Sequence, residues 1–383
     1  MTPFWKKQPK KPECAKAIQT SRTESTPFGA IDEYFTLERP EHRLYEQIRR
    51  LIPIVDAAIG KIIRLMGEFE VQCENPEAQA QLEKFLQTVP VSGTGMGIYA
   101  FLKAYMDDLL VYGNAVGEIV LTADENEIFG LYNAPVERLV VKRAEDGIGT
   151  DLFQREKLGL RPIENNDNIL FTALNPRSGE LVGRPILEGL PFVSNILLKI
   201  YGATEKNFDR VGNVRFAVTY RPGSGASEKA YAKERAEAIA KEWADAMRSD
   251  EVKDFVAVGD VDIKVIGADN QTLDTEIPVR QMLEQIVAKL GIPPYLLGLS
   301  WSTTERMSTA QADILTSELM SYQRVLTPVI THISTLFLRM HGFSDDPMID
   351  WMDINLLDEV EGANARYLKA KAMQIEQQLE ENL

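Results

Sequence analysis

The sequence is poor in the residues that most often build metal and redox sites. Its 383 residues include only two cysteines, Cys14 and Cys73, and their spacing matches neither a metal site nor a disulfide framework. The three histidines, His42, His332 and His341, lie in no HExxH motif and no Cys/His cluster. The sequence therefore predicts no metal and no cofactor, and nothing in it indicates an oxidising compartment.

Long apolar runs are also missing. No stretch approaches roughly 18 apolar residues without a charge, so we expect no membrane-spanning helix and no membrane partner. The first residues, MTPFWKKQPKKPECAK, lack the apolar middle of a signal peptide. A soluble, intracellular chain is the expectation that follows.

The sequence also lacks an excess of basic residues. The formal net charge is −15, which excludes a free-standing protein that binds nucleic acid through clustered lysines and arginines. The basic residues that stand apart from acids are Lys6, Lys7, Lys10 and Lys11, in the proline-containing N-terminal segment. We expect residues 1–28 to form a disordered basic arm, since such tails are more often solvated than binding.

Hydrophobic residues make up 44% of the sequence, which is enough for an apolar core and for more than one lobe. Apolar residues recur at helical spacing over 44–66, where Pro53 predicts either one kinked helix or two helices. Further helices are predicted over 76–88 and 98–110. Strands are predicted within 68–73, 111–124, 128–147 and 168–176. This mixture predicts an α+β fold.

The second half reads as helices interrupted by a small module. Residues 212–268 predict a strand, an Ala-rich helix and two further strands, placed between helices over about 191–210 and 273–290. A long helix follows over 309–340, with Pro328 inside it, and a kink is expected there. A strand over 348–355 and an acidic helix from Asp358 complete the expected order.

Three features could indicate an enzyme, and each has a simpler interpretation. SGTGMG at 92–97 precedes a helix, as phosphate loops do, but a flexible loop is the favoured interpretation. Asp262 and Lys264 on one strand are typical of one half of a metal-dependent nuclease site, but they also fit the solvent side of a strand. His332 beside the apolar stripe of the long helix fits a packed residue better than a catalytic base, and we expect no catalytic residues.

The connection LGIPPYLLGLSWSTTERMSTAQADI at 290–314 is longer than most helix–helix connections. Gly291 can end one helix, Pro293 and Pro294 prevent its continuation, and Ser308 or Thr309 can cap the next. The pair Leu296–Leu297 is expected to hold the base of this loop, leaving 301–307 free to project.

This order of elements resembles the bacteriophage portal protein family, of the type found in long non-contractile-tailed phages. The resemblance rests first on KLGIPPYLLG at 289–298, followed by a polar stretch and a long helix. Supporting matches are YGNAVGEIV at 112–120, LYNAPVERLVV at 131–141, NFDRVGNVRFAV at 207–218 and DINLLDEVEGANARYLKAKAM at 353–373. Together these cover roughly residues 40–375, although the 207–218 segment lacks the Asn-Gly and Pro usual in the family.

The resemblance implies a portal-like subunit with wing, stem helices, a small α/β clip, a tunnel loop and a long kinked helix. On this basis residues 1–28 form the arm, 29–190 the wing, 191–211 and 270–291 the two stem helices, 212–269 the clip, 292–308 the tunnel loop, 309–345 the long kinked helix and 346–383 a short crown-like C-terminal segment.

The same resemblance implies a ring, usually of twelve subunits, at a capsid vertex of the virion, assembled in the host cytoplasm. Double-stranded DNA would pass through it, and its partners would be terminase, head-completion or adaptor proteins, and the major capsid or scaffolding protein. The residues implied are of three kinds: the DNA-facing loop Ser300, Trp301, Ser302, Thr303, Thr304, Glu305 and Arg306; the loop base Gly291, Pro293, Pro294, Leu296 and Leu297; and stem contacts to DNA at Lys199, Lys206 and Arg210.

Two alternatives stay open from the sequence. A metal-dependent nuclease using Asp262 and Lys264 would cleave DNA in the presence of Mg²⁺. A capsid-associated adaptor without a pore would assemble only on a partner. A large ring-shaped oligomer of the purified protein separates the portal hypothesis from both.

Overall fold

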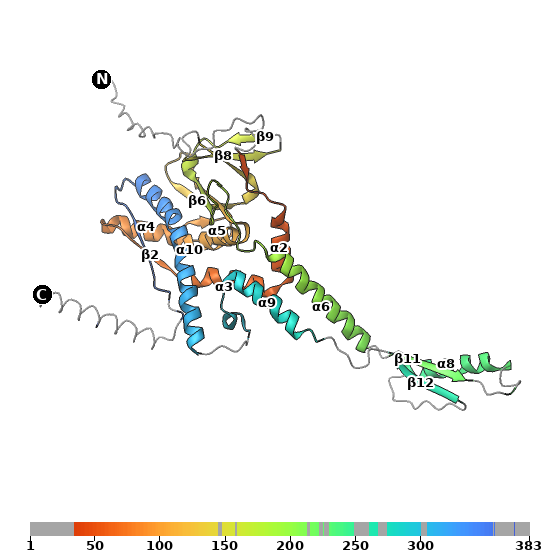
Figure 1. Cartoon of the computed structure of the whole chain (residues 1–383). Helices are drawn as coiled ribbons and strands as arrows, with labels where there is room; N and C mark the ends of the chain where they lie inside the picture. Colours follow the sequence, from red (N-terminus) through yellow and green to blue (C-terminus); the bar gives the residue numbers. More distant parts are fainter. Residues whose placement is uncertain are drawn as a thin grey trace, which may run out of the picture. The chain divides into compact units, whose positions relative to one another are not determined.

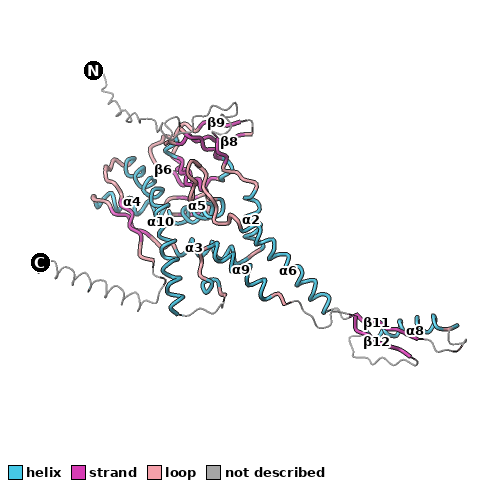
Figure 2. Tube along the Cα trace, viewed as in Figure 1, coloured by secondary structure: helices cyan, strands magenta, loops and turns pink. Residues whose placement is uncertain are grey.

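The computed structural model describes residues 34–144, 148–157, 159–212, 215–221, 225, 230–248, 260–266, 274–299, 305–354, 356 and 371. The chain divides into two compact units, one made of residues 1–194 and 284–383, the other of residues 195–283. Helices and strands occur in both (Figure 1 and Figure 2), which confirms the α+β class. The predicted basic arm, the helix from Asp358 and the strand at 254–259 lie outside the described residues.

The first unit begins with strand β1 (Tyr34–Thr36) and two helices, α2 (Glu41–Leu51) and α3 (Pro53–Leu65). The structure has two separate helices here, which is one of the two arrangements predicted from Pro53. Ile52 is extended, with φ −121° and ψ 91°, as expected of a residue before proline, and Pro53 starts the next helix, where its missing N–H costs nothing.

A five-stranded sheet forms the middle of this unit, in the order β10–β5–β6–β3–β4. Its strands are β3 (Pro90–Val91), β4 (Gly95–Met96), β5 (Asn114–Leu121), β6 (Ile128–Ala134) and β10 (Ile169–Ala173). All its pairs are antiparallel except β3 with β6. Helix α5 (Ile98–Tyr112) packs on β5, and its buried residues include Phe101 and Tyr105.

A four-stranded antiparallel sheet has the order β1–β7–β8–β9. It consists of β1, β7 (Leu139–Arg143), β8 (Thr150–Glu156) and β9 (Gly159–Pro162), with the short 3₁₀ turn η1 (Val136–Arg138) before β7. Strands β1, β8 and β9 were not predicted from the sequence.

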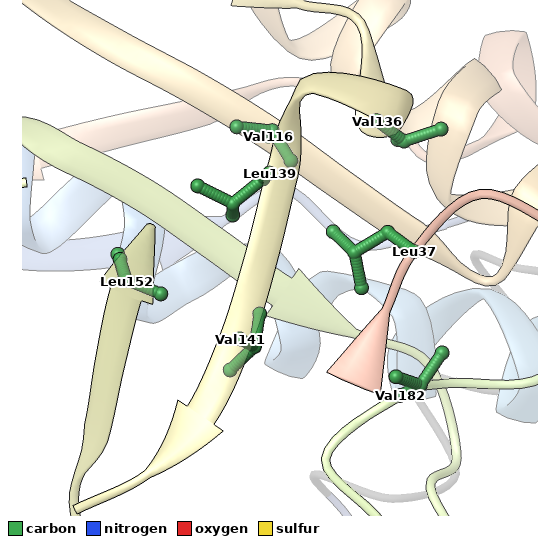
Figure 3. Close-up of a cluster of buried hydrophobic side chains, with 7 residues drawn as sticks. All are labelled: Leu37, Val116, Val136, Leu139, Val141, Leu152 and Val182. Atoms are coloured by element: carbon green, nitrogen blue, oxygen red, sulfur yellow. The ribbon is translucent and has the colours of Figure 1, made fainter. Parts of the chain in front are cut away.

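The two sheets share a core. Seven buried apolar side chains meet there (Figure 3), from β5 of one sheet, from β7 and β8 of the other, and from the segments around them: Leu37, Val116, Val136, Leu139, Val141, Leu152 and Val182. Burying this surface is the main favourable contribution to the packing of the sheets. The predicted wing region therefore contains a continuous apolar core.

The long helix α10 (Glu305–Met340) has 36 residues, about 54 Å at the usual rise per residue, and contains Pro328. Its buried residues follow helical spacing, for example Leu315, Leu319, Leu326 and Ile330. After it, β13 (Met348–Trp351) pairs antiparallel with β2 (Phe69–Gln72). Helix α4 (Pro76–Thr88) packs against α10, where Phe85 stacks on Phe337 at 4.2 Å.

The second unit contains the inserted module that was predicted over 212–268. Strand β11 (Arg215–Arg221) pairs antiparallel with β12 (Asp260–Ile266), and helix α8 (Ala232–Arg248) packs on β11. Helix α6 (Leu190–Gly212) enters this unit and helix α9 (Glu276–Leu290) leaves it.

Candidate functional site

The helix before the predicted loop ends as its residue types require. The N–H of Gly291 donates to the carbonyl of Val287 at 3.0 Å, and Gly291 has a φ of 69°, a left-handed value suited to glycine. Pro293 then takes an extended conformation, with φ −54° and ψ 135°. Because proline has no N–H, α9 cannot continue through Pro293.

A single 3₁₀ turn follows, η3 (Pro294–Leu297), and it packs against α3. Gly298 closes the turn with a φ of 76°, and the N–H of Leu299 donates to the carbonyl of Pro294 at 3.1 Å. The chain is thus held in a defined conformation up to Leu299, immediately before the segment expected to face DNA.

The base of the loop is buried mainly through a residue that the sequence reasoning missed. Ile292 is only 2% exposed and Pro293 is buried, whereas Leu296 and Leu297 are half-buried. An apolar residue between a helix-ending glycine and two prolines is the signal that could have identified Ile292. Its burial makes the start of η3 a fixed point of the first unit.

Of the predicted DNA-facing residues, Ser300, Trp301, Ser302, Thr303 and Thr304 lie outside the described residues. Helix α10 begins at Glu305, four residues before the predicted start at Thr309. Glu305 and Arg306 therefore belong to its first turn rather than to a loop, and Arg306 is exposed there. Glu and Arg are good helix formers, so the helix can begin at them rather than at Thr309.

A shallow hollow of about 280 Å³ lies beside this turn. Its lining is mostly apolar and comes from the end of α9, the Pro-Pro segment and the second and third turns of α10, including Val287, Ile292, Pro294 and Ile314. Ile314 is 64% exposed, so this part of the surface carries apolar area that the described chain does not cover.

The predicted stem contacts lie on α6. Lys199 and Lys206 are both exposed. They are seven residues apart, which places them two turns apart on one face of the helix. Arg210 is in the same helix, but its side chain is outside what the structure describes.

The segment YGN at 112–114, part of the family resemblance, connects α5 to the start of β5. Gly113 has a φ of 77°, and a Cβ there would lie 2.6 Å from the backbone of Arg184. The fully buried Asn114 accepts a hydrogen bond from the N–H of Gly183 at 2.8 Å through its side-chain oxygen. This motif is therefore structural: it holds the chain before α6 against the central sheet.

A charged cluster lies between α2, α3 and α5. Arg49 contacts Asp107 at 2.7 Å and Asp56 at 2.8 Å. Asp108, the neighbour of Asp107, has a pKa raised to about 7, first because of its burial and then because of the negative charges of Asp107 and Glu137. Perturbed acids are common at functional sites, but ion-pair networks also produce them.

The enzyme hypotheses gain no support from the described residues. Asp262 Oδ2 lies 4.0 Å from Arg221 Nη2 on the paired strand β11, an ion pair across a two-stranded sheet. The side chain of Lys264 lies outside what the structure describes. Within the described ranges no group of three or more His, Cys, Asp or Glu side chains is placed to hold a metal ion.

The glycine-rich segment 92–97 is a tight β-hairpin rather than the flexible loop that was favoured. The N–H of Ser92 donates to Leu131, that of Thr94 to Val91 and that of Gly97 to Val89. These amides already have carbonyl partners within the protein, so they are not presented to a phosphate. A Cβ at Gly97 would lie 2.9 Å from the carbonyl oxygen of Gln87, which explains the glycine.

His332 and His341 are both exposed, so His332 is not the packed residue that was expected, and each ring bonds to a backbone carbonyl. His332 Nε2 lies 2.6 Å from the carbonyl oxygen of Asp167 and joins α10 to the turn before β10. His341 Nδ1 lies 2.9 Å from the carbonyl oxygen of Phe337, at the end of α10. In the part of the chain that the structure describes, no helix is both long enough and apolar enough to cross a membrane.

Comparison with solved structures shows the fold. A chain of the neck of an empty gene transfer agent (GTA) particle, computed with C6 symmetry, aligns with a TM-score of 0.65 and 13% identity over 88% of this chain and 91% of that chain. A chain of the virion of the native GTA particle aligns with a TM-score of 0.62 and 14% identity over 88% and 90%.

A chain of the neck of the native particle, computed with C12 symmetry, aligns with a TM-score of 0.58 and 15% identity over 83% and 85%. No protein-family model matches the sequence, and neither does any curated protein sequence. The chain therefore has the fold of these virion and neck chains.

Proposed function

We propose that the protein is a phage-type portal subunit. Twelve copies form a ring at one vertex of a capsid, and double-stranded DNA passes through the ring during packaging and ejection. The ring also serves as the docking site for terminase and for head-completion proteins. In this role the protein is a conduit rather than an enzyme.

The observation that carries the proposal is the likeness along 88% of the chain to a chain of a particle neck whose structure was computed with rotational symmetry. The sequence supports it independently, because the segments that resemble the portal family occur in the family's order. The turn at Gly291–Gly298, which opens that resemblance, is an ordered structural element here.

The first experiment tests the ring. Twelve chains of 43.0 kDa should give a particle of about 0.5 MDa with a central hole in negative-stain images. Mass photometry at several salt concentrations measures the same quantity in solution. A monomer or dimer under all conditions would contradict the proposal, and assembly only on an added capsid would indicate an adaptor without a pore.

The second experiment tests the conduit. We propose that residues 300–306 face the DNA and that Lys199, Lys206 and Arg210 add contacts along the stem helix. The net charge of −15 suits this role, because a chain that neutralises few phosphates holds DNA weakly and lets it slide. A photo-crosslinking residue at Trp301 or Arg306 should label DNA trapped during packaging. The same residue at the exposed turn position Glu125 should not.

The proposal also assigns partners and location. The clip, residues 212–269, would meet terminase during packaging and head-completion proteins afterwards. The wing, residues 29–190, would meet the major capsid or scaffolding protein. The ring would assemble in the host cytoplasm and remain in the virion at the capsid vertex. Deleting residues 215–266 should abolish terminase binding in pull-down assays and leave the ring intact.

A further inference from the structure

The two-stranded sheet of β2 and β13, in the first unit, has hydrogen bonds that show which way its backbone groups point. The N–H of Phe69 donates to the Tyr99 hydroxyl at 3.0 Å, and that hydroxyl donates to the Phe69 carbonyl at 3.1 Å. The backbone groups of Phe69 are therefore turned away from β13. Phe69 and Trp351, which are paired in the register, form a non-hydrogen-bonded pair of the antiparallel ladder.

It follows that β13 has an unpaired edge. Pairs of the two kinds alternate along the ladder, so Ile349 with Val71 is of the same kind as Trp351 with Phe69. The backbone groups of Ile349 and Trp351 therefore point away from β2. In the part of the chain that the structure describes, no group donates to them or accepts from them. A row of unpaired N–H and carbonyl groups is a template for another extended segment.

The side chains on the outer face of this sheet limit what can bind along the edge. Met348, Asp350 and Met352 alternate on β13, and the two methionines are 67% and 47% exposed. Glu70 of β2 is directly opposite Asp350, and Glu68 precedes β2 on the same face. Like charges directly opposite each other destabilise a sheet. Among the described residues, no basic side chain pairs with these three carboxylates.

The charges exclude one occupant and favour another. A second copy of β13 would place its own Asp350 against this Asp350, because the unpaired groups lie on either side of that residue. A segment with lysines and apolar side chains fits instead. Residues 4–11, FWKKQPKK, have two aromatic residues and four lysines, and no acid. Residues 12–33 join this segment to β1 and span up to roughly 70 Å when extended, more than the diameter of about 50 Å expected for a compact unit of this size.

We propose that the edge of β13 binds residues 4–11 of the same chain. Backbone groups of the segment bond to Ile349 and Trp351, and its lysines lie beside Asp350 and Glu70. Because the segment is tethered to the first unit, its effective concentration at the edge is high. The basic N-terminal segment then has a binding site, whereas the sequence alone favoured a solvated tail. Binding requires neither DNA nor a ring.

Hydrogen exchange of the full-length protein, resolved to single residues by fragmentation, tests the edge. The amides of Ile349 and Trp351 should exchange slowly in the parent protein, because the bound segment accepts from them. The double variant Lys6→Glu, Lys7→Glu should speed their exchange about fivefold or more, since it turns attraction to the acidic face into repulsion.

A matched variant controls for the change in net charge. Lys103→Glu, Lys157→Glu reverses the same number of charges at two exposed positions away from the edge. It should leave the exchange of the two β13 amides unchanged. Equal acceleration in both double variants would overturn the proposal, because the effect would then come from net charge.

A photo-crosslinking residue at position 5, in place of Trp5, identifies the occupant. It should label the peptide that contains residues 348–352, and the product should keep the mass of one chain on a denaturing gel. Asp350→Lys should reduce the labelling severalfold, because it removes the attraction to the lysines. Glu125→Lys, at the exposed turn between β5 and β6, should not.

Two further outcomes would overturn the proposal. Fast exchange of both amides in the parent protein would mean that the edge is open to water and that its carboxylates only prevent pairing between copies. A crosslink that joins two chains would mean that the segment binds to a neighbouring copy. Ring formation is measured separately, so failure here leaves the portal proposal untouched.

Discussion

Trp351 in β13 donates a hydrogen bond from its indole Nε1 to the hydroxyl oxygen of Thr327, at 2.9 Å. Thr327 immediately precedes Pro328 in α10, and its own hydroxyl donates to the carbonyl of Gln323 at 2.8 Å. Because Pro328 has no N–H, the helix loses one backbone hydrogen bond at this point. The returning strand β13 is thus bonded to α10 at the position where the helix is locally weakest.

Removing the Thr327 hydroxyl should lower the stability of the fold. Thr327→Val keeps the shape of the side chain but leaves the indole N–H of Trp351 without its partner. We expect the free energy of unfolding to fall by about 1 kcal/mol, the net worth of a hydrogen bond whose donor is only partly buried. Thr327→Ser retains the hydroxyl and should lose much less. Denaturant titrations at one fixed protein concentration provide the measurement, and equal losses in both variants would contradict the assignment.

Gln323, also in α10, connects this helix to Met66 at the end of α3. Its side-chain Nε2 donates to the carbonyl of Met66 at 2.7 Å, and the Gln323 side chain is buried. Gln323→Leu should therefore lower the free energy of unfolding by about 1–3 kcal/mol, because the carbonyl of Met66 is left unpaired. Gln87→Leu, at an exposed position of α4, should change it by no more than about 0.5 kcal/mol. A comparable loss at Gln87 would indicate a general intolerance of leucine.

Gly113 should tolerate no side chain. A Cβ there would lie 2.6 Å from the backbone of Arg184, and its φ of 77° disfavours any other residue. Gly113→Ala should cost about 3 kcal/mol or more from strain and overpacking together. In the same unit, Gly60→Ala meets only the flexible end of Arg64 at 3.2 Å and lies within α3. It should stabilise the protein by up to about 1 kcal/mol. Soluble yield and melting temperature separate the two.

Local patterns in the sequence predicted the elements whose geometry depends on local residues. Pro53 limited the first helical region to two arrangements, and Gly291 with Pro293 predicted the end of α9. In each case the effect is local: the missing N–H of proline, or the left-handed φ of glycine, constrains the backbone of the residues next to it. Such signals need no knowledge of distant residues.

Elements that depend on distant partners were missed. Strands β8 and β9 have no clear apolar alternation, so only pairing makes them strands: β8 pairs with β7, and β9 pairs with β8. The two-residue strands β3 and β4 likewise depend on pairing, β3 with β6 and β4 with β3. At the candidate site, the burial of Ile292 and the hydrogen bond of Asn114 to Gly183 come from tertiary packing, which no single-sequence pattern contains.

Asp108 should make stability depend on pH in the direction opposite to that of an ordinary ion-paired acid. Its pKa is raised from 3.8 to about 7, mainly by burial, so the folded state binds a proton that the unfolded state releases between those values. Stability from this group is therefore present below about pH 4 and is lost as pH rises towards 7. Asp108→Asn should raise the melting temperature at pH 8 and change it much less at pH 5.

The neighbouring acid provides the control for this prediction. Asp107 contacts Arg49 at 2.7 Å, so Asp107→Asn removes half of an ion pair. It should lower the melting temperature at both pH values, because the attraction to Arg49 is lost, but less at pH 8, where removing the Asp107 charge also relieves its repulsion of ionised Asp108. Opposite signs for two adjacent aspartates at pH 8 would show that burial dominates at Asp108. A lower melting temperature for Asp108→Asn at pH 8 would instead mean that its carboxylate has a stabilising partner, and the raised pKa would then be wrong.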